Sequence, residues 1–187
     1  ASGRVIEDGS DAVAALRGYA ESDLCGSTVV LSAGMNPRLF NYMSRRPEFD
    51  PDASGTFEKK ICLKVSDFRS AWVQGKILAK KGLWVSEFRI ESGLNCGGHA
   101  FPTDGYLLGP ILEEFRNRRG ELTEGLFDAY KDALKSKDQF VFNEPFPIRL
   151  TVQGGIGTSE EDDFLRSYYA MDGTGWGTPF LLVPEAT

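Results

Sequence analysis

The feature that most constrains this chain is a repeated order of apolar strand, glycine or polar turn, and amphipathic helix. Five apolar runs rich in β-branched residues predict buried strands: residues 28–34, 60–66, 83–90, 148–153, and a short run that ends near Gly175. Strand-turn-helix units of this kind build parallel sheets with right-handed crossovers. The sequence therefore predicts an α/β fold, in a single domain over residues 1–187.

Helix signals fill the intervals between these strands. Periodic apolar positions predict helices over the N-terminal portion to about Leu24, 38–44, 68–81, about 159–170, and twice within 105–147. Ser66 or Asp67 is placed to cap the helix at 68, and Gly82 to end it. Thr158 and Glu161 have the spacing of a capping box, which predicts a helix start at Ser159.

Composition excludes several classes of protein. The chain carries 21 Lys and Arg against 27 Asp and Glu, a net charge of −6 without a dense basic cluster, which disfavours nucleic acid as a partner. No apolar run approaches the roughly 18 residues of a membrane helix. Cys25, Cys62 and Cys96 form no Cys-x-x-Cys pair, which argues against disulfide frameworks and structural zinc. We expect a cytoplasmic protein acting on a small molecule, with a homo-oligomer possible.

Two glycine-rich turns follow the last two predicted strands. The first holds Gly154, Gly155 and Gly157, and the second holds Gly177 and Thr178. Glycine lets a backbone approach a ligand closely, and a following helix adds the positive end of its dipole, so the pair predicts a phosphate site. The simpler alternative is that these glycines only make tight turns between strand and helix.

His99 is the single histidine of the chain, and it follows Gly97 and Gly98 after the third predicted strand. Its unperturbed pKa lies near neutrality, which suits a proton acceptor, although a lone histidine often has a structural role. Cys96 has no partner for a nucleophilic triad and is interpreted as a small buried residue. The adjacent acids Asp162 and Asp163 point in different directions on a helix, so we expect no metal site.

Three segments, in this order, resemble the nitronate monooxygenase family, also called 2-nitropropane dioxygenases. They are Gly-Leu-Asn-Cys-Gly-Gly-His at 93–99, Gln-Gly-Gly-Ile-Gly at 153–157, and Gly-Trp-Gly-Thr-Pro-Phe-Leu-Leu-Val-Pro-Glu at 175–185. The family has a Gly-Gly-His segment, an Ala-Gly-Gly-Ile segment and a Met-Gly-Thr run after successive strands. Asn95, Cys96 and Trp176 depart from the family's usual Glu, Ala and Met.

The resemblance implies an FMN-binding parallel (β/α) barrel of TIM type. In it Gly97 and Gly98 lie near the flavin and His99 handles the proton of the substrate. The flavin phosphate is then held by backbone amides of four residues: Gly154, Gly155, Gly177 and Thr178. A complete barrel has eight strands, so the five predicted strands would be the fourth to the eighth of an incomplete barrel.

The resemblance therefore implies an FMN-dependent oxidoreductase that oxidises a small carbanion-forming substrate such as an alkyl nitronate. Two alternatives stay open. Flavin-dependent enoyl-thioester reductases that use NAD(P)H carry similar segments. A barrel that binds a phosphorylated metabolite without turnover, or another phosphate-binding barrel enzyme, would share the phosphate turns alone.

Overall fold

The sheet of this protein is entirely parallel, and its strands follow one another in chain order. The computed structural model describes residues 9–91, 95–96, 99–100 and 107–177. Five strands form the sheet in the order β1-β2-β3-β6-β7. They are β1 (Ser27–Leu31), β2 (Lys59–Val65), β3 (Val85–Ile90), β6 (Arg149–Gln153) and β7 (Gly173–Gly175). All five strands predicted from the sequence are confirmed.

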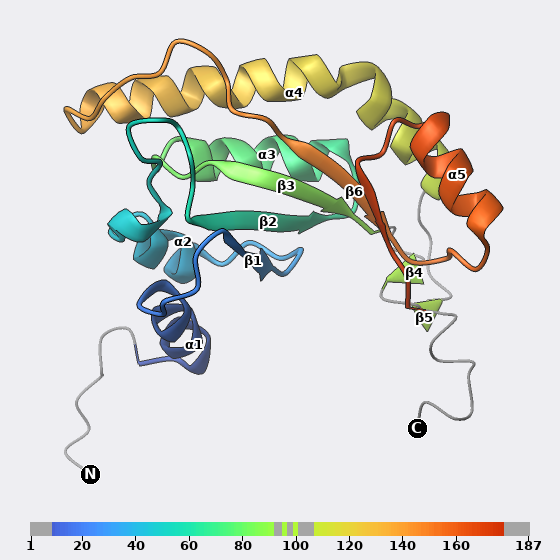
Figure 1. Cartoon of the computed structure of the whole chain (residues 1–187), viewed down its shortest axis with the longest axis horizontal. Helices are drawn as coiled ribbons and strands as arrows, with labels where there is room; N and C mark the ends of the chain where they lie inside the picture. Colours follow the sequence, from blue (N-terminus) through green and yellow to red (C-terminus); the bar gives the residue numbers. More distant parts are fainter. Residues whose placement is uncertain (1–8, 92–94, 97–98, 101–106, 178–187) are drawn as a thin grey trace.

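The strand order distinguishes between the two common parallel architectures. A doubly wound sheet reverses its order at a switch point, whereas here each strand is added at the same edge. Repeated right-handed crossovers to one edge leave the helices on one face and curl the sheet. The result is a five-stranded α/β half-barrel, with α4 running along the outer face above α3 (Figure 1).

Five α-helices and three short elements complete the described chain. The helices are α1 (Asp11–Ala20), α2 (Pro37–Met43), α3 (Phe68–Ala79), α4 (Leu108–Ser136) and α5 (Ser159–Ser167). A 3₁₀ turn, η1, covers Pro47–Phe49, and β4 (Asn95–Cys96) pairs antiparallel with β5 (His99–Ala100). Although α4 is 29 residues long, its charged side chains leave it, like every other described helix, short of the apolar length that a bilayer crossing needs.

The predicted N-terminal caps of α3 and α5 are present, whereas α3 ends at Ala79 with Lys80 as its C-cap, two residues before Gly82. Asp67, rather than Ser66, caps α3 and accepts a hydrogen bond from the amide of Ser70 at 2.6 Å. Thr158 and Glu161 form the capping box of α5, which ends at Ser167 rather than near Ala170. Polar side chains at these positions satisfy amides that the first helical turn leaves without partners. Local sequence therefore sets where these helices begin.

The prediction of two helices within 105–147 is wrong, because α4 is one continuous helix. Its apolar stripe keeps a helical period from Ile111 to Leu134, so the whole length buries one face. Arg118 pairs with Glu114 at 2.5 Å and with Glu121 at 2.8 Å across the middle of the helix. The buried apolar face and these ion pairs on the exposed face offset the weak helix propensity of Gly120 and Gly125.

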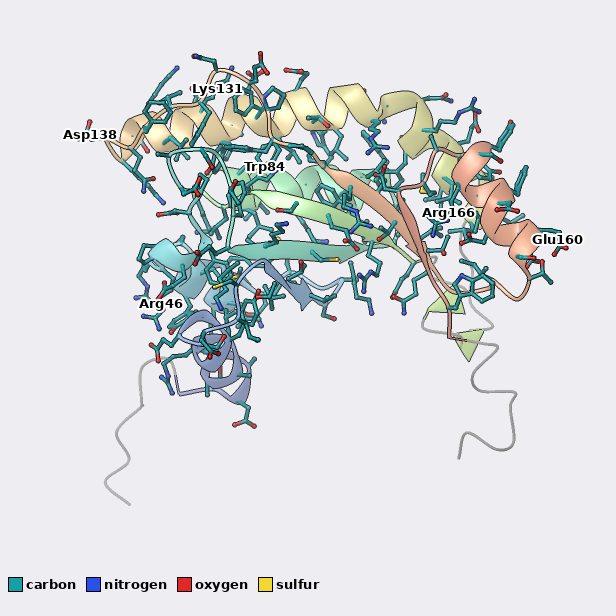
Figure 2. All side chains as sticks on the ribbon, in the orientation of Figure 1. Arg46, Trp84, Lys131, Asp138, Glu160 and Arg166 are labelled. Atoms are coloured by element: carbon teal, nitrogen blue, oxygen red, sulfur yellow. The ribbon has the colours of Figure 1, made fainter. Side chains whose placement is uncertain are left out.

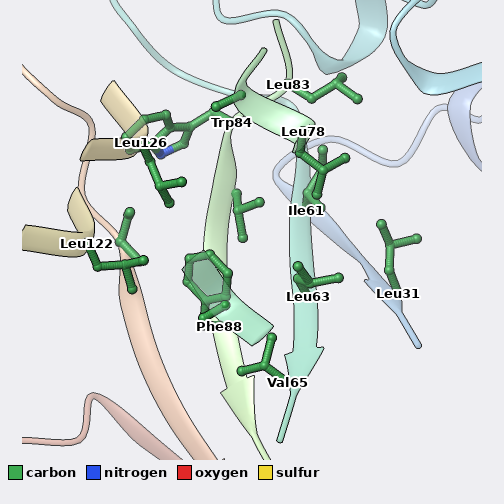
Figure 3. Close-up of a cluster of buried hydrophobic side chains, with 14 of the residues drawn as sticks. Leu31, Ile61, Leu63, Val65, Leu78, Leu83, Trp84, Phe88, Leu122 and Leu126 are labelled. Carbon is green, nitrogen blue, oxygen red and sulfur yellow. The ribbon is translucent and has the colours of Figure 1, made fainter. Parts of the chain in front are cut away.

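The hydrophobic core lies between the sheet and the pair α3 and α4. Alternate residues of β2 and Phe88 of β3 point toward Leu78 of α3 and toward Leu122 and Leu126 of α4 (Figure 3). The β2 residues on this face are Ile61, Leu63 and Val65, all buried. Burying aliphatic and aromatic area is the main stabilising term for such a layer.

Candidate functional site

The two glycine-containing turns lie side by side at the carboxyl ends of β6 and β7. Gln153 is the register partner of Gly175, and the amide of Gly154 donates to the carbonyl of Gly175 at 3.3 Å. In parallel α/β sheets, ligands bind at this edge, beyond the carboxyl ends of the strands. The structure thus places the turn that holds Gly154 and Gly155 beside Gly175, two residues before Gly177 of the second turn.

The first turn has a backbone that only glycine adopts easily. Gly154 has φ of 94° and Gly155 has φ of 73°, both in the left-handed region. The amide of Gly154 already donates to the carbonyl of Gly175. Gly155 is exposed, and its amide has no acceptor among the residues that the structure describes. Gly155 therefore carries a donor that a ligand oxygen could use.

The start of α5 already holds a carboxylate. Oε2 of Glu161 accepts hydrogen bonds from the amides of Gly157 at 2.8 Å and Thr158 at 3.1 Å. The hydroxyl of Thr158 accepts from the amide of Glu161 in return, at 3.3 Å. A helix N-terminus stabilises negative charge, and here the protein supplies that charge itself. An external anion at these two amides would have to displace Glu161.

The second turn carries an exposed aromatic ring. Trp176 stands between Gly175 and Gly177 and is 37% exposed, and its indole N–H donates to the hydroxyl of Thr174 at 3.1 Å. That hydroxyl in turn donates to Asp162 of α5. The hydrogen bonds of Asp162 lower its pKa, so the carboxylate stays ionised beside the turn. These contacts tie the second turn to the helix after the first.

Neighbouring side chains, and no ligand, account for the glycines of β7. A Cβ added at Gly173 would stand 3.2 Å from both Arg149 and Thr151, and one at Gly175 would stand 3.0 Å from Gln153. Gly173 and Gly175 therefore have a packing role, in which they leave room for side chains of β6. The phosphate interpretation depends on Gly155 and on the residues after Gly175.

His99 lies close to the same edge in the backbone, within the short strand β5 and opposite Cys96 of β4. Asn95 follows Ile90 by five residues, so β4 begins no more than about 18 Å from the end of β3. The side chain of His99, together with Gly97, Gly98 and Thr178, lies outside the described residues. The predicted roles of these four residues stay predictions.

The inner face of the sheet, opposite the helices, carries a charged cluster that the sequence analysis did not find. Its centre is Glu87 of β3, which is 7% exposed. Oε1 of Glu87 accepts from Arg89 at 2.8 Å and from the hydroxyl of Thr151 at 2.8 Å, while Arg149 lies 3.4 Å from Oε2. The cluster joins β3 to β6 through side chains.

The neighbours of Glu87 fix its ionisation. Burial acts to raise its pKa, but the hydrogen bonds from Thr151 and Arg89 outweigh burial, and the net pKa lies below the ordinary value. Cys62 of β2 also contacts this carboxylate, at 3.4 Å. Burial, with the charge of Glu87, raises the pKa of Cys62 to about 12, so the sulfur is a thiol and a poor nucleophile.

A second ion pair stands closer to the carboxyl edge on the same face. Lys64 of β2 lies 3.0 Å from the carboxylate of Glu91, whose side chain is almost fully buried. In the sequence, alternating charged residues within a strand indicate a solvated face, so only the pairing register reveals the cluster.

No group of three metal-ligating side chains occurs in the described part of the chain. The chain matches no protein-family model, no curated protein and no solved structure.

Proposed function

We propose that this chain is an FMN-dependent oxidoreductase resembling nitronate monooxygenase, built on a barrel of TIM type to which the half-barrel contributes five strands. The observation that carries the proposal is the contact between Gly154 and Gly175, which makes one edge site from two glycine turns. In parallel barrels the loops after the last two strands commonly bind phosphate. The observed order of strands supports the same placement.

The described residues fit the phosphate group of such a coenzyme. The amide of Gly155 is a donor without an acceptor among them, and a glycine lets a ligand approach the backbone closely. In the proposal Gly177 and Thr178 add amides from the second turn, and Gly154 contributes its turn geometry. Backbone amides and a helix end can hold a phosphate without a cationic side chain.

The chemistry of the proposal divides between coenzyme and protein. FMN, when bound, supplies the redox step, and the protein supplies position, proton transfer and electrostatics. His99, on the hairpin after β3, is the residue that would take the proton from the carbon next to the nitro group. In the proposal Gly97 and Gly98, which carry no side chains, lie near the flavin. Trp176, exposed beside the second turn, is placed to border the same edge.

The absorbance spectrum of the purified protein, before and after addition of FMN, tests the proposal. We expect a visible flavin band that stays with the protein through gel filtration. His99→Ala should then retain flavin but lose most turnover of an alkyl nitronate, because only the proton acceptor is removed. A protein that remains colourless and retains no added FMN contradicts the assignment, and unchanged turnover in the variant removes His99 from the reaction.

A further inference from the structure

The amino-terminal edge of the sheet, opposite the proposed flavin edge, carries a separate cavity of about 420 Å³. One wall is residues 50–53, which precede β2, and the other is residues 139–142, which follow α4 and precede β6. Asp138, next to this cavity, and Glu160 of α5 lie at opposite ends of the molecule (Figure 2). The cavity therefore stands apart from the glycine turns. Its volume is within the range of small-molecule sites.

Aromatic rings form the apolar part of this cavity. Phe140 is 72% exposed, and its ring meets that of Phe142 edge to face with centroids 5.0 Å apart. Phe142 in turn packs on Phe146, at 4.8 Å, and Leu134 of α4 also lines the cavity. A large apolar side chain left this exposed loses the stabilisation that burial gives, and a ligand lying against it would restore part of that.

Two carboxylates form the polar part of the cavity. Asp50 accepts one hydrogen bond, from the amide group of Gln139 at 3.3 Å, and Asp52 accepts three within its own turn. Neither carboxylate has a cationic side chain within ion-pair distance among the described residues. The ammonium of Lys137, whose charge acts on Asp50, donates to the carbonyl of Lys81 at 2.6 Å. The cavity therefore has a net negative charge beside exposed aromatic rings.

We propose that this cavity binds a small organic cation, an ammonium group carried on an apolar or aromatic body. The ammonium would pair with Asp50 and lie near the face of Phe140, and the apolar body would cover Phe142 and Leu134. Aromatic faces and carboxylates both attract cations, and their combination is typical of sites for organic ammonium ions. The same carboxylates would repel an organic anion of equal size.

Three isosteric probes test the charge preference by calorimetric titration: 2-phenylethylammonium, 2-phenylethanol and phenylacetate. We expect the ammonium to bind about tenfold more tightly than the alcohol, and the carboxylate to bind more weakly than both, since the probes differ mainly in charge. Equal affinity for the ammonium and the alcohol would overturn the proposal, as would preference for the carboxylate or no binding of the ammonium.

Two variants test the location of the binding site. Asp50→Asn keeps a group that can bond Gln139 but removes one charge, and it should reduce the affinity for 2-phenylethylammonium toward that for the alcohol, with a residual preference from Asp52. Phe140→Ala should weaken binding of all three probes severalfold by removing the exposed ring. The matched controls Asp163→Asn and Phe164→Ala change the same residue types on α5 and should leave binding unchanged. Loss of binding in either control variant would contradict the assigned site. Unchanged affinity for 2-phenylethylammonium in Asp50→Asn would contradict it as well.

Discussion

The hydroxyl of Thr151 on β6 donates to Oε1 of Glu87 on β3 at 2.8 Å, on the inner face of the sheet. Two arginines complete the surroundings of this carboxylate, one from its own strand and one from β6. A buried carboxylate held in this way stabilises the fold only while its partners are present. The stability of the sheet therefore depends on the ionisation of Glu87.

Glu87→Gln should destabilise the protein at neutral pH by about 1 to 2 kcal/mol, because Arg89 and Arg149 lose their ionised partner but remain in contact with solvent. The pKa of Glu87 is lowered in the folded protein, so its stabilisation is complete above the ordinary glutamate value of about 4.5 and is lost as pH falls through the folded value. Urea unfolding at pH 7 and pH 3 checks this. The difference between wild type and variant should shrink at pH 3, and a constant difference would contradict the account.

Two alanine substitutions within α4 should have opposite effects on stability. Gly120 is exposed, and an added Cβ there would meet nothing within 4 Å, so Gly120→Ala should stabilise by up to about 1 kcal/mol. A Cβ at Gly125 would overlap the ring of Trp72 on α3, so Gly125→Ala should destabilise by about 1 to 3 kcal/mol. Thermal unfolding of both variants measures the difference. Equal shifts would show that α3 and α4 do not pack in this way.

The sequence predicted most of the fold because the strands and caps have local signals. The runs at 60–66 and 148–153 are apolar on the side that packs, and Asp67 and Thr158 bond amides within three residues of themselves. The prediction of two helices rested on the length of the interval 105–147, whereas α4 is one helix of 29 residues that packs against α3, with Gly125 against Trp72. The apolar positions from Ile111 to Leu134 keep one helical period, which is the local signal that favours a single helix.

The candidate sites were only partly predictable. The two glycine turns could be found because both follow strands, and parallel pairing brings such ends together. The Glu87 cluster depends on the register of β3 against β6, which a single chain does not specify. The cavity between Asp50 and Phe140 joins segments almost ninety residues apart, each of which reads alone as a loop.

Glu161→Ala should change stability and anion binding in opposite directions. The carboxylate caps the amides of Gly157 and Thr158, so its loss should cost about 1 kcal/mol of stability. The same loss frees two donors, so the affinity for inorganic phosphate or FMN should rise if the proposed site is correct.

Glu160→Ala is the matched control for Glu161→Ala. It removes an equal charge from the same helical turn without freeing the amides of Gly157 and Thr158. Its effect on phosphate affinity should therefore be smaller. Equal gains in the two variants would assign the effect to net charge and not to the freed amides.

Cys25 and Cys62 should differ in their rate of alkylation. Cys25 is exposed, whereas Cys62 is buried and burial helps raise its pKa to about 12. Iodoacetamide at pH 8 should therefore modify Cys25 in the folded protein and reach Cys62 only in urea, because the thiolate is the reactive form. Peptide mass mapping gives the site of modification. Rapid labelling of Cys62 in the folded protein would contradict its position at the centre of the sheet.

The central claim is that two adjoining glycine turns hold the phosphate of a flavin coenzyme, and the ratio of affinities for FMN and riboflavin tests it most directly. The two ligands differ only in the phosphate group. We expect FMN to bind at least about a hundredfold more tightly, since several charge-assisted amide bonds depend on that group. We also expect Gly155→Ala, which disfavours the left-handed φ of 73° that the first turn needs, to reduce that ratio severalfold. Equal affinity for FMN and riboflavin, or no binding of either, would contradict the claim.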